Sequence, residues 1–529
     1  MHASKRTATI SSLLLAAFTS GSLAQTSAPI VSTSHGAVSG VMSQGVRQYL
    51  AIPFAAPPVG ELRWQPPQPP APWSGIRDGS VPSKRFAQVK TSFGAESLTE
   101  DCLYLNVHVP SDIGSRRLPV MVWIHGGAFI SGAAPDYDMR TLATKAQAVV
   151  VSINYRLGPF GFFRTPELVA QSAPVNFGLQ DQQAALRWVR DDIERFGGDP
   201  NNVTIFGESA GGISTCLHLA SPQSKNLFHK AISQSGPCRL STQRTAADVE
   251  DAANHLTTAA GCVPGPGQLA CLRSKSASEI LAAQGDEWGL LKNNVKWTAV
   301  PDGITLQGRP DELIRSGQFN RVPVLLGSNR DEGRLFVATE QHLKYLLPLS
   351  TWKFDQALAT LAGGDSGFQK QLAATYTRWN HLTLDRALGA ALTDGYFSCN
   401  VANDAKELGQ HVPVYQYEFT EANTPGVIDP YMSMGAFHGA ELRFLFQAKL
   451  PGPTIFWPLS SAQQKLADQM GAYWGNFARS ADPNGLNLPK WPRLQPSAAS
   501  ALLLDSKGIS IAGTDKLRDI HHCDLWERP

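Results

Sequence analysis

Runs of apolar residues recur along the chain from residue 118 onward. The run Leu118-Pro119-Val120-Met121-Val122-Trp123-Ile124 is apolar throughout, as expected for a strand that is buried on both faces. A second apolar run predicts a strand at 149–153, and we expect further strands at 203–206, 230–234, 322–326 and 412–419.

Between these runs the apolar positions change to a helical period. Ala185, Val189, Ile193 and Phe196 form one face of a predicted helix, and Gly197-Gly198-Asp199-Pro200 is expected to end it. The small and apolar residues at 210–219 predict another helix. Strands that alternate with helices indicate an α/β fold, with a mainly parallel central sheet and helices on both faces.

Residues 53–72 contain eight prolines, which excludes a central strand or helix there. Tryptophans and apolar residues lie among the prolines and favour a rigid surface connection over a polyproline ligand. The chain shows no internal repeat, no low-complexity linker and no abrupt change of composition. We therefore expect one large domain at residues 25–529, preceded by a leader at residues 1–24.

The leader has the features of a secretory signal. Lys5 and Arg6 precede an apolar stretch at 13–18, and Ser22-Leu23-Ala24 offers small residues for cleavage. Polar residues interrupt the apolar stretch, so we expect no membrane span and a secreted or periplasmic protein. The chain has 46 basic and 44 acidic residues. Without the two basic residues of the leader the charges balance, which gives no indication of a nucleic-acid partner.

The segment Gly207-Glu208-Ser209-Ala210-Gly211 is a G-x-S-x-G motif. Glycines on both sides let a strand and a helix meet at a strained turn, from which the serine hydroxyl projects. A single match of this motif is weak evidence in a glycine-rich chain. Here it lies between a predicted strand and a predicted helix, as the mechanism requires, so Ser209 is a candidate nucleophile.

A serine nucleophile needs backbone N–H groups that stabilise the oxyanion. These come from the residue after the nucleophile and from a glycine-rich loop after an earlier strand. His125-Gly126-Gly127 follows the strand at 118–124. We therefore expect Gly126, Gly127 and Ala210 to form the oxyanion hole, although the glycine pair alone could be an ordinary turn.

The acid and the histidine should follow the nucleophile in the chain. Asp331 and Glu332 follow the apolar run at 322–326, and the spacing does not choose between them. His438 is one of nine histidines after Ser209, and it lies in a loop with Gly439. The pair His521-His522 could suggest a metal, but two adjacent side chains in a tail are more typical of solvent exposure.

Seven cysteines in an exported chain indicate disulfides and at least one free thiol. Cys262 and Cys271 flank a Gly/Pro-rich loop that they can close, and Cys399 with Cys523 could tie the tail to the body. Neither spacing suits a metal. Cys216 and Cys238 have apolar neighbours, which favours buried thiols.

The ordered motifs resemble the type B carboxylesterase family, which includes the cholinesterases and some fungal lipases. The resemblance runs nearly end to end. Its motifs are Phe54-Ala55-Ala56-Pro57-Pro58-Val59-Gly60, Glu100-Asp101-Cys102-Leu103-Tyr104-Leu105-Asn106, His125-Gly126-Gly127-Ala128-Phe129, Asn154-Tyr155-Arg156-Leu157-Gly158, Phe196-Gly197-Gly198-Asp199-Pro200 and Phe206-Gly207-Glu208-Ser209-Ala210-Gly211-Gly212.

This resemblance implies an α/β-hydrolase fold with long loop insertions. It maps the acid onto Glu332 and the base onto His438, and implies an inner network of Glu208, Ser235 and Glu441. The bridges Cys262–Cys271 and Cys399–Cys523 fit the family. Relatives pair the cysteine that matches Cys102 with an earlier one, but Phe86-Ala87-Gln88 offers none, so Cys102 is expected to be unpaired.

The implied activity is that of a serine ester hydrolase that forms an acyl-enzyme, with a small-molecule ester and water as its substrates and no cofactor or metal. A lipase, a thioesterase or an amidase could use the same machinery. A non-catalytic adhesion module is a rival of another class, but it would be expected to lack one of the three catalytic residues. The natural ester stays open, because loops read the substrate.

Overall fold

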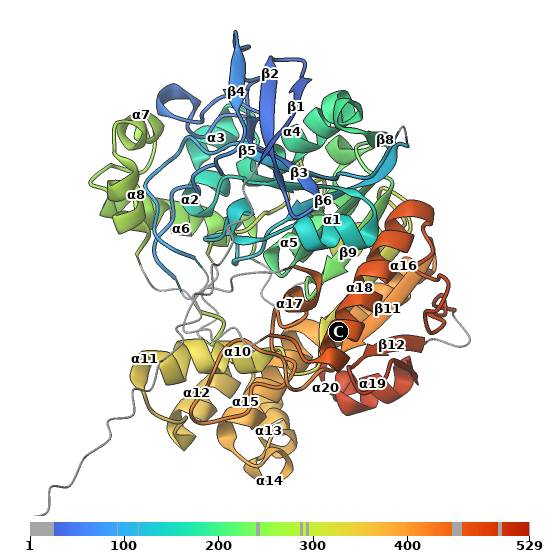
Figure 1. Ribbon diagram of the computed structural model, residues 1–529. Helices are drawn as coiled ribbons and strands as arrows, with labels where there is room; N and C mark the ends of the chain where they lie inside the picture. The colour runs from blue at the N-terminus through green and yellow to red at the C-terminus, as the bar shows by residue number, and fades with distance from the viewer. Residues whose placement is uncertain are drawn as a thin grey trace, which may run out of the picture.

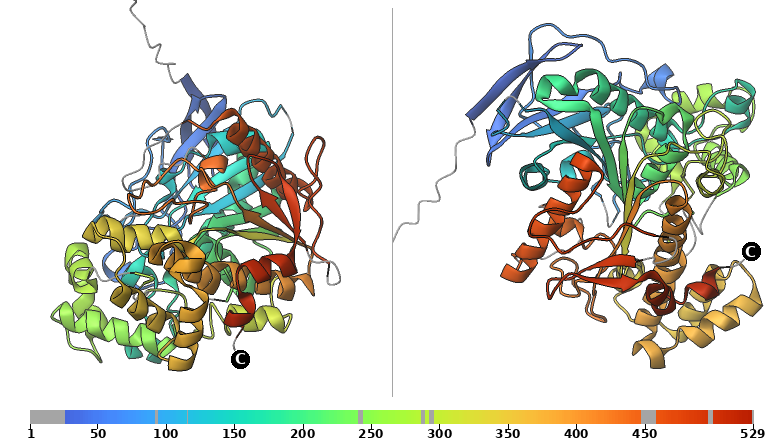
Figure 2. Two further views of the ribbon diagram at one scale, coloured as in Figure 1. Left: turned by 90° about the horizontal axis from the view of Figure 1, so that it is seen from below. Right: turned by 90° about the vertical axis from the view of Figure 1, so that its right-hand side faces the viewer.

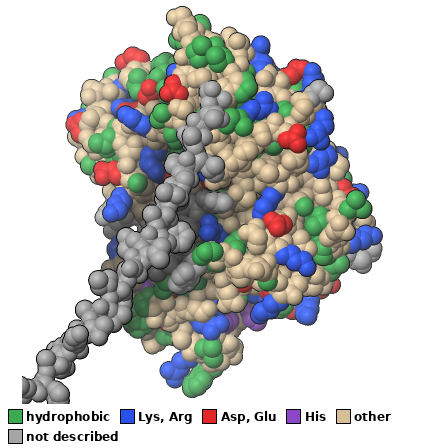
Figure 3. Space-filling model, in the orientation of Figure 1, with side chains coloured by type: hydrophobic (Ala, Val, Ile, Leu, Met, Phe, Trp, Pro, Cys, Tyr) green, Lys and Arg blue, Asp and Glu red, His purple; other side chains and the backbone are tan. Residues whose placement is uncertain are grey.

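The computed structural model describes residues 26–91, 94–114, 116–239, 244–285, 289–291, 296–446, 458–495 and 500–527. The leader expected at residues 1–24 lies outside these ranges. Among the described residues no helix combines the length and the apolar character needed to cross a bilayer. Basic and acidic side chains are interspersed over the face shown in Figure 3.

One sheet contains the strands of the described residues, in the order β1-β2-β3-β5-β7-β6-β8-β9-β10-β11-β12-β13, with β4 paired to β2. The pairs from β7 through β6 to β12 are parallel, and the pairs outside this range are antiparallel apart from β2 with β4. The strands are β1 Thr26–Ser32, β2 Ala37–Ser43, β3 Val46–Pro53, β4 Ile76–Asp78, β5 Tyr104–Pro110, β6 Leu118–Ile124, β7 Val149–Ile153, β8 Gly198–Glu208, β9 Lys230–Gln234, β10 Val324–Asn329, β11 Val414–Phe419, β12 Ser500–Leu504 and β13 Ser510–Gly513.

Helices cover both faces of this sheet (Figure 1). Along β6 the side chains alternate: Val120 and Val122 join one buried cluster with α4 and α5, whereas Met121 and Trp123 join another with α1 and α18. The helices are α1 Arg140–Ala146, α2 Gly158–Gly161, α3 Pro166–Ala170, α4 Phe177–Asp192, α5 Ala210–Ala220, α6 Ala246–Ala259, α7 Gln268–Arg273, α8 Ala277–Gln284, α9 Pro310–Arg315, α10 Gly333–Val337, α11 Leu343–Tyr345, α12 Thr351–Leu361, α13 Ser366–Thr375, α14 Arg378–His381, α15 Leu384–Leu392, α16 Cys399–Gly409, α17 Leu442–Leu445, α18 Ser461–Ser480, α19 Thr514–Ile520 and α20 Cys523–Trp526.

The predicted elements of the central sheet are present. The strands expected at 118–124, 149–153 and 230–234 have those bounds, and the helix expected at 185–196 begins earlier, at Phe177. Gly197, with φ of 87°, ends the helical turn, but the next strand begins at once at Gly198. The strands β1 to β5, β12 and β13 were not predicted.

The proline-rich segment is a connection, as expected. It contains one short 3-10 turn at Gly60–Leu62 and no central strand or helix. Trp64 is fully buried, stacks on Phe163 and donates its indole N–H to the carbonyl of Pro159 at 2.8 Å. The aromatic side chain therefore anchors the connection to the core.

A helical lobe, defined as residues 333–398, is inserted between β10 and β11. It contains α10 to α15 and occupies the lower part of Figure 1. The right-hand view of Figure 2 shows the lobe at the end of the molecule opposite to β1 and β2. Glu332 immediately precedes this lobe.

Candidate active site

Ser209 lies on the turn between β8 and α5, with φ of 55° and ψ of −123°. A positive φ is rare for a residue with a side chain and is typical of strained functional turns. Gly207 and Gly211 allow this turn, because a Cβ atom on Gly211 would overlap the carbonyl oxygen of Ile124, and one on Gly207 would overlap Gly211. The amide of Ser209 donates to the carbonyl of Gln234 at 2.9 Å.

Glu332 and His438 meet in the loops that follow β10 and β11. Nδ1 of His438 lies 2.6 Å from Oε2 of Glu332, and both side chains are buried. The rings of Phe336 and Phe397 lie 5.1 and 4.8 Å from the imidazole. This arrangement fixes the plane of the imidazole and keeps water away from the carboxylate.

Asp331, the other acid that the sequence allowed, faces elsewhere. Its Oδ2 accepts the amide of Ala436 at 2.9 Å, and its Oδ1 pairs with Arg334 at 2.6 Å. Asp331 therefore holds the loop that leads to His438, and Glu332 is the carboxylate that reaches the ring.

The other nitrogen of His438 points to the Ser209 turn. Nε2 lies 3.2 Å from Oε1 of Glu208, the residue before the candidate nucleophile. Gly126 closes the same space, since a Cβ atom placed there would lie 3.1 Å from the Cβ of Ser209. The structure thus brings His438, Glu208, Ser209 and Gly126 together.

The loop after β6 has an unusual backbone. Gly127, Ala128 and Phe129 follow one another with φ values of 102°, 55° and 61°. The carbonyl of Gly127 turns back to accept the amides of Ile130 and Ser131, each at 3.0 Å. Ala210 is the first residue of α5, where a backbone N–H has no intrahelical acceptor. Gly126 and Ala210 therefore border the Ser209 turn, and Gly127 follows Gly126 in the loop after β6.

A second layer of polar residues supports the acid. Asn329 donates its amide to Oε1 of Glu332 at 2.7 Å and its side-chain N–H to Oε2 of Glu441 at 2.6 Å. Gln234 donates to Oε1 of Glu441 at 3.0 Å, and its own oxygen accepts the indole N–H of Trp474. Asn329 and Gln234 were missed from the sequence, because each is the last residue of a strand and carries no motif.

Ser235 is not joined to the expected inner network. Its hydroxyl is buried without a hydrogen-bond partner among the described residues, and its amide donates to the carbonyl of Gly327 at 2.8 Å. Gln234 and Asn329 contact Glu441 where the resemblance implied Ser235.

Three buried carboxylates around one imidazole shift one another's pKa values. Burial raises the pKa of Glu208; the charge of His438 lowers it by less, and the charges of Glu441 and Glu332 add to the rise. Burial and the charge of Glu332 likewise raise the pKa of Glu441. Burial lowers the pKa of His438, but the carboxylates of Glu208 and Glu332 outweigh burial, so this pKa is raised overall. The site therefore retains protons that isolated side chains would release.

Three disulfides are formed by the described cysteines: Cys262–Cys271, Cys399–Cys523 and Cys216–Cys238. The first two agree with the resemblance. The prediction that Cys216 and Cys238 are buried thiols is wrong, because α5 packs on β9 with the two Cα atoms 5.1 Å apart. Disulfides are typical of proteins outside the reducing cytosol.

Cys102 is buried and unpaired, as expected. Burial raises the pKa of its thiol well above the ordinary value, so the thiol stays protonated. Gln88, which is fully buried, holds the neighbouring loop in another way. Its side chain donates to the carbonyl of Gly132 at 3.1 Å and accepts the amide of Gly132 at 2.9 Å. Hydrogen bonds from Gln88 to the loop after β6 therefore fix the segment for which relatives have a disulfide that this chain lacks.

His521 is buried, which contradicts its predicted solvent exposure. Nδ1 lies 2.6 Å from Asp394 and Nε2 lies 2.6 Å from Glu418. Two carboxylates with no other ligand make this an ion-paired histidine, and the described residues contain no group of three or more His, Cys, Asp or Glu that could hold a metal ion.

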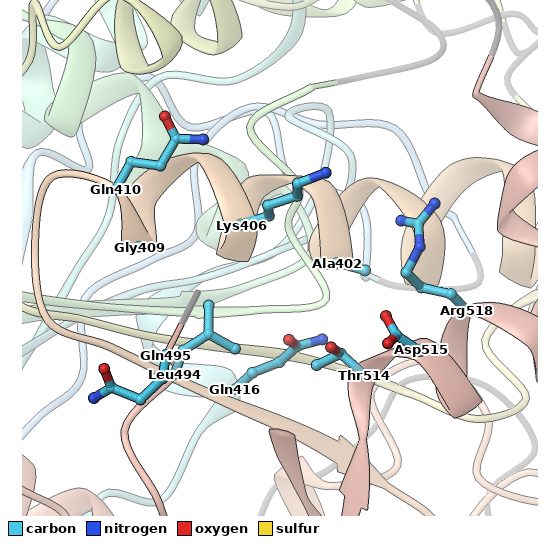
Figure 4. Close-up of a pocket in the computed structure, with 10 residues that line it drawn as sticks. All are labelled: Ala402, Lys406, Gly409, Gln410, Gln416, Leu494, Gln495, Thr514, Asp515 and Arg518. Atoms are coloured by element: carbon cyan, nitrogen blue, oxygen red, sulfur yellow. The ribbon is translucent and has the colours of Figure 1, made fainter. Parts of the chain in front are cut away.

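A pocket of about 340 Å³ between α16, β11 and α19 is lined by polar residues such as Lys406, Asp515 and Arg518 (Figure 4). None of its lining residues belongs to the site around Ser209. This pocket is therefore separate from the candidate site at the edge of the sheet where β6, β8, β10 and β11 end.

This arrangement defines the class of α/β-hydrolases. It consists of a parallel sheet, a serine on the turn after β8, and an acid and a histidine after β10 and β11. The carboxylesterase family model matches residues 27–526. The chain belongs to this family and is a carboxylic ester hydrolase.

Three proteins similar to this chain are named as esterases. Human cocaine esterase is 36% identical over 90% of this chain and 89% of its own length. Rabbit liver carboxylesterase 1 is 36% identical over 88% of this chain and 87% of its own length. Among solved structures, a thermophilic PNB esterase has a TM-score of 0.78 and 32% identity, and the match covers 93% of this chain and 99% of that one.

Proposed function

We propose that the protein hydrolyses esters through a catalytic triad of Ser209, Glu332 and His438. One observation carries the assignment: a single imidazole bonds Glu332 through Nδ1 and faces the Ser209 turn through Nε2. An imidazole held in this way can accept the proton of a serine hydroxyl while the carboxylate stabilises the imidazolium that forms.

In the first step the Ser209 oxygen attacks the ester carbonyl carbon and its proton passes to His438. The carbonyl oxygen takes up negative charge and receives N–H donors from Gly126, Gly127 and Ala210. The carbon–oxygen bond to the alcohol then breaks, and His438 returns the proton to the alcohol. Water repeats the two steps on the acyl-enzyme and releases the acid. No metal or organic cofactor enters this sequence.

The decisive experiment replaces Ser209 by alanine and measures hydrolysis of p-nitrophenyl acetate together with mass labelling by a fluorophosphonate. We expect the loss of more than about 10³-fold in kcat and the loss of the label. Ser214→Ala is the matched control, because this buried serine lies on the same helix and bonds the carbonyl of Ala210. Full turnover by Ser209→Ala, or labelling of that variant, would show that another residue is the nucleophile.

The substrate within the ester class is a separate question, because a lipase, a thioesterase or an amidase could use the same triad. The names of the relatives cover different esters: one is a cocaine esterase and another, from rat, a pyrethroid hydrolase. A substrate panel that varies the acyl and alcohol parts separately, compared by kcat/KM, measures this selectivity. The same panel should include a thioester and an anilide.

We further propose that residues 1–24 are a secretory leader, that 25–529 form one domain, and that the mature protein is secreted or periplasmic. The three disulfides support an oxidising compartment. N-terminal sequencing of the exported protein tests the leader, and a first residue of Gln25 is the expected result.

A further inference from the structure

An exposed hydrophobic surface lies at the tip of the helical lobe, where the end of α11, the start of α12 and the loop before His438 meet. We call it the apolar cap. Its members, with their exposed fractions, are Tyr345 (45%), Leu346 (69%), Leu347 (62%), Trp352 (65%), Ile428 (43%) and Tyr431 (36%). The two segments are joined directly, since the hydroxyl of Tyr431 donates to the carbonyl of Leu346 at 2.6 Å.

Leucine is an energetically unfavourable residue at position 346. It ends α11 with φ of 56° and ψ of 33°, the left-handed conformation in which glycine or asparagine is ordinarily found. A leucine there combines backbone strain with an exposed side chain, and neither contributes to the stability of the fold. Such a local conflict between residue and environment is typical of a functional surface.

The apolar cap is flanked by basic residues. The ammonium groups of Lys344 and Lys353 lie 5.7 and 3.9 Å from the ring centre of Tyr345. Two carboxylates of the same region, Asp385 and Asp429, point inward and bond the buried His342 at 2.7 and 2.6 Å. The outer surface therefore presents tryptophan, tyrosine and leucine beside two ammonium groups and one exposed carboxylate, Asp355 of α12. Apolar and aromatic side chains beside a net positive charge suit a lipid–water boundary.

Both chain segments that carry the proposed acid and base run to this surface. Helical turns continue from Glu332 through α10, the π-helical turn Ala338–His342 and α11 to Leu346. Ile428 and Tyr431 lie in the loop that leads to His438. Hydrophobic side chains are visible at the lower left of Figure 3, over the position of α11 in Figure 1.

We propose that the apolar cap docks the protein onto an anionic lipid–water interface. A second copy of the chain fits this surface less well, because a twofold contact would bring Lys344 and Lys353 of both copies together. A lipid surface accepts the leucine and aromatic side chains and attracts the two ammonium groups. Esters dissolved in the lipid would then reach the enzyme, and this corollary rests on the proposed hydrolase activity.

Flotation with phospholipid vesicles tests the proposal on the mature chain. We expect binding to vesicles with about 30 mol% phosphatidylserine and weaker binding to pure phosphatidylcholine, with loss at high salt. Leu346→Asn with Leu347→Ser should weaken binding at least about tenfold. Leu346→Asn relieves the left-handed strain, so this variant is expected to fold. Lys344→Glu should reduce only the preference for anionic lipid.

The matched control is Leu486→Ser, which removes a leucine that is 95% exposed outside the apolar cap. It should bind vesicles as the unchanged protein does. Equal binding by the Leu346/Leu347 variant, or no binding by the unchanged protein, would overturn the proposal. A dimer in size-exclusion chromatography that this variant dissociates would overturn it in favour of self-association. Hydrolysis of water-soluble p-nitrophenyl acetate, unaffected in these variants, reports separately on the proposed triad.

Discussion

Oε2 of Glu332 lies 2.6 Å from Nδ1 of His438, across 106 positions of sequence. The other oxygen of Glu332 accepts the backbone amide of Asn329, which fixes the carboxylate at the end of β10. With Nδ1 bonded in this way, Nε2 is the nitrogen left to exchange a proton with Ser209 in the proposed triad. The choice of Glu332 over the adjacent Asp331 as the partner of Nδ1 therefore favours the tautomer of His438 that carries its proton on Nδ1.

Replacing Glu332 by glutamine tests that choice. The amide keeps the size of the side chain but removes the charge that stabilises the imidazolium, so kcat/KM for a nitrophenyl ester should fall by about 10²- to 10⁴-fold. Asp331→Asn is the paired control, because Asp331 bonds Ala436 and Arg334. Its kcat/KM should stay within about threefold of the unchanged enzyme. The reverse ranking of the two variants would move the acid to Asp331.

The pH dependence of the reaction should respond to Glu208. Its carboxylate, 3.2 Å from Nε2 of His438, favours the imidazolium and raises the pKa of His438. The base must be neutral to act, so kcat/KM rises with pH through this pKa. Glu208→Gln removes the negative charge, and the acidic limb should move to lower pH by about one unit.

The control for this shift is Glu312→Gln, which neutralises an acid paired with Arg309 at 3.4 Å. The acidic limb should not move in that variant. A limb that stays in place in Glu208→Gln, or moves to higher pH, would mean that Glu208 does not interact with the base in the free enzyme.

The central sheet could be predicted because buried parallel strands are apolar on both faces. β6 and β7 are buried along their full length, and their bounds follow from the apolar runs alone. The outer strands alternate buried and half-exposed residues, as in the pattern of β2. Their signal is short and mixed, which is why the antiparallel edge was not predicted.

The candidate site was predictable only where glycines and motifs mark it. The Ser209 turn needs Gly207 and Gly211, and the sequence shows both. Asn329 and Gln234 bind Glu441 through side-chain amides at strand ends that no motif marks, so only their positions opposite Glu441 reveal them. His521 could not be placed from the sequence, because its partners Asp394 and Glu418 are far away in the chain.

The Cys216–Cys238 disulfide should stabilise the helix that begins at the nucleophile. It closes 22 residues of chain and ties α5 to the segment after β9, where Gly236 packs directly on Gly212. Replacing both cysteines by alanine should lower the free energy of unfolding by about 2–4 kcal/mol and reduce kcat more than it raises KM.

The control is the double alanine variant of Cys262 and Cys271, which opens a loop of only 9 residues outside the site and should leave kcat unchanged. A thiol count on the denatured, unreduced protein should find only Cys102 free. A count of three, with an unchanged stability of the first variant, would show that Cys216 and Cys238 are thiols.

The ion-paired His521 should make stability depend on alkaline pH. Burial lowers its pKa, but Asp394 and Glu418 outweigh burial and raise the pKa to about 10. A histidine whose folded pKa exceeds its unfolded value stabilises the fold fully below the unfolded pKa, and this stabilisation is lost as pH rises toward 10.

The free energy of unfolding, measured by denaturant from pH 6 to 10, should therefore fall with pH by more than in His521→Gln. That variant leaves the buried Asp394 without its cation and Glu418 with Arg330 alone, and should lose about 3 kcal/mol at neutral pH. His522→Gln, which changes the exposed neighbour, should keep the pH slope of the unchanged protein. Parallel slopes for all three proteins would mean that His521 is neutral in the folded state.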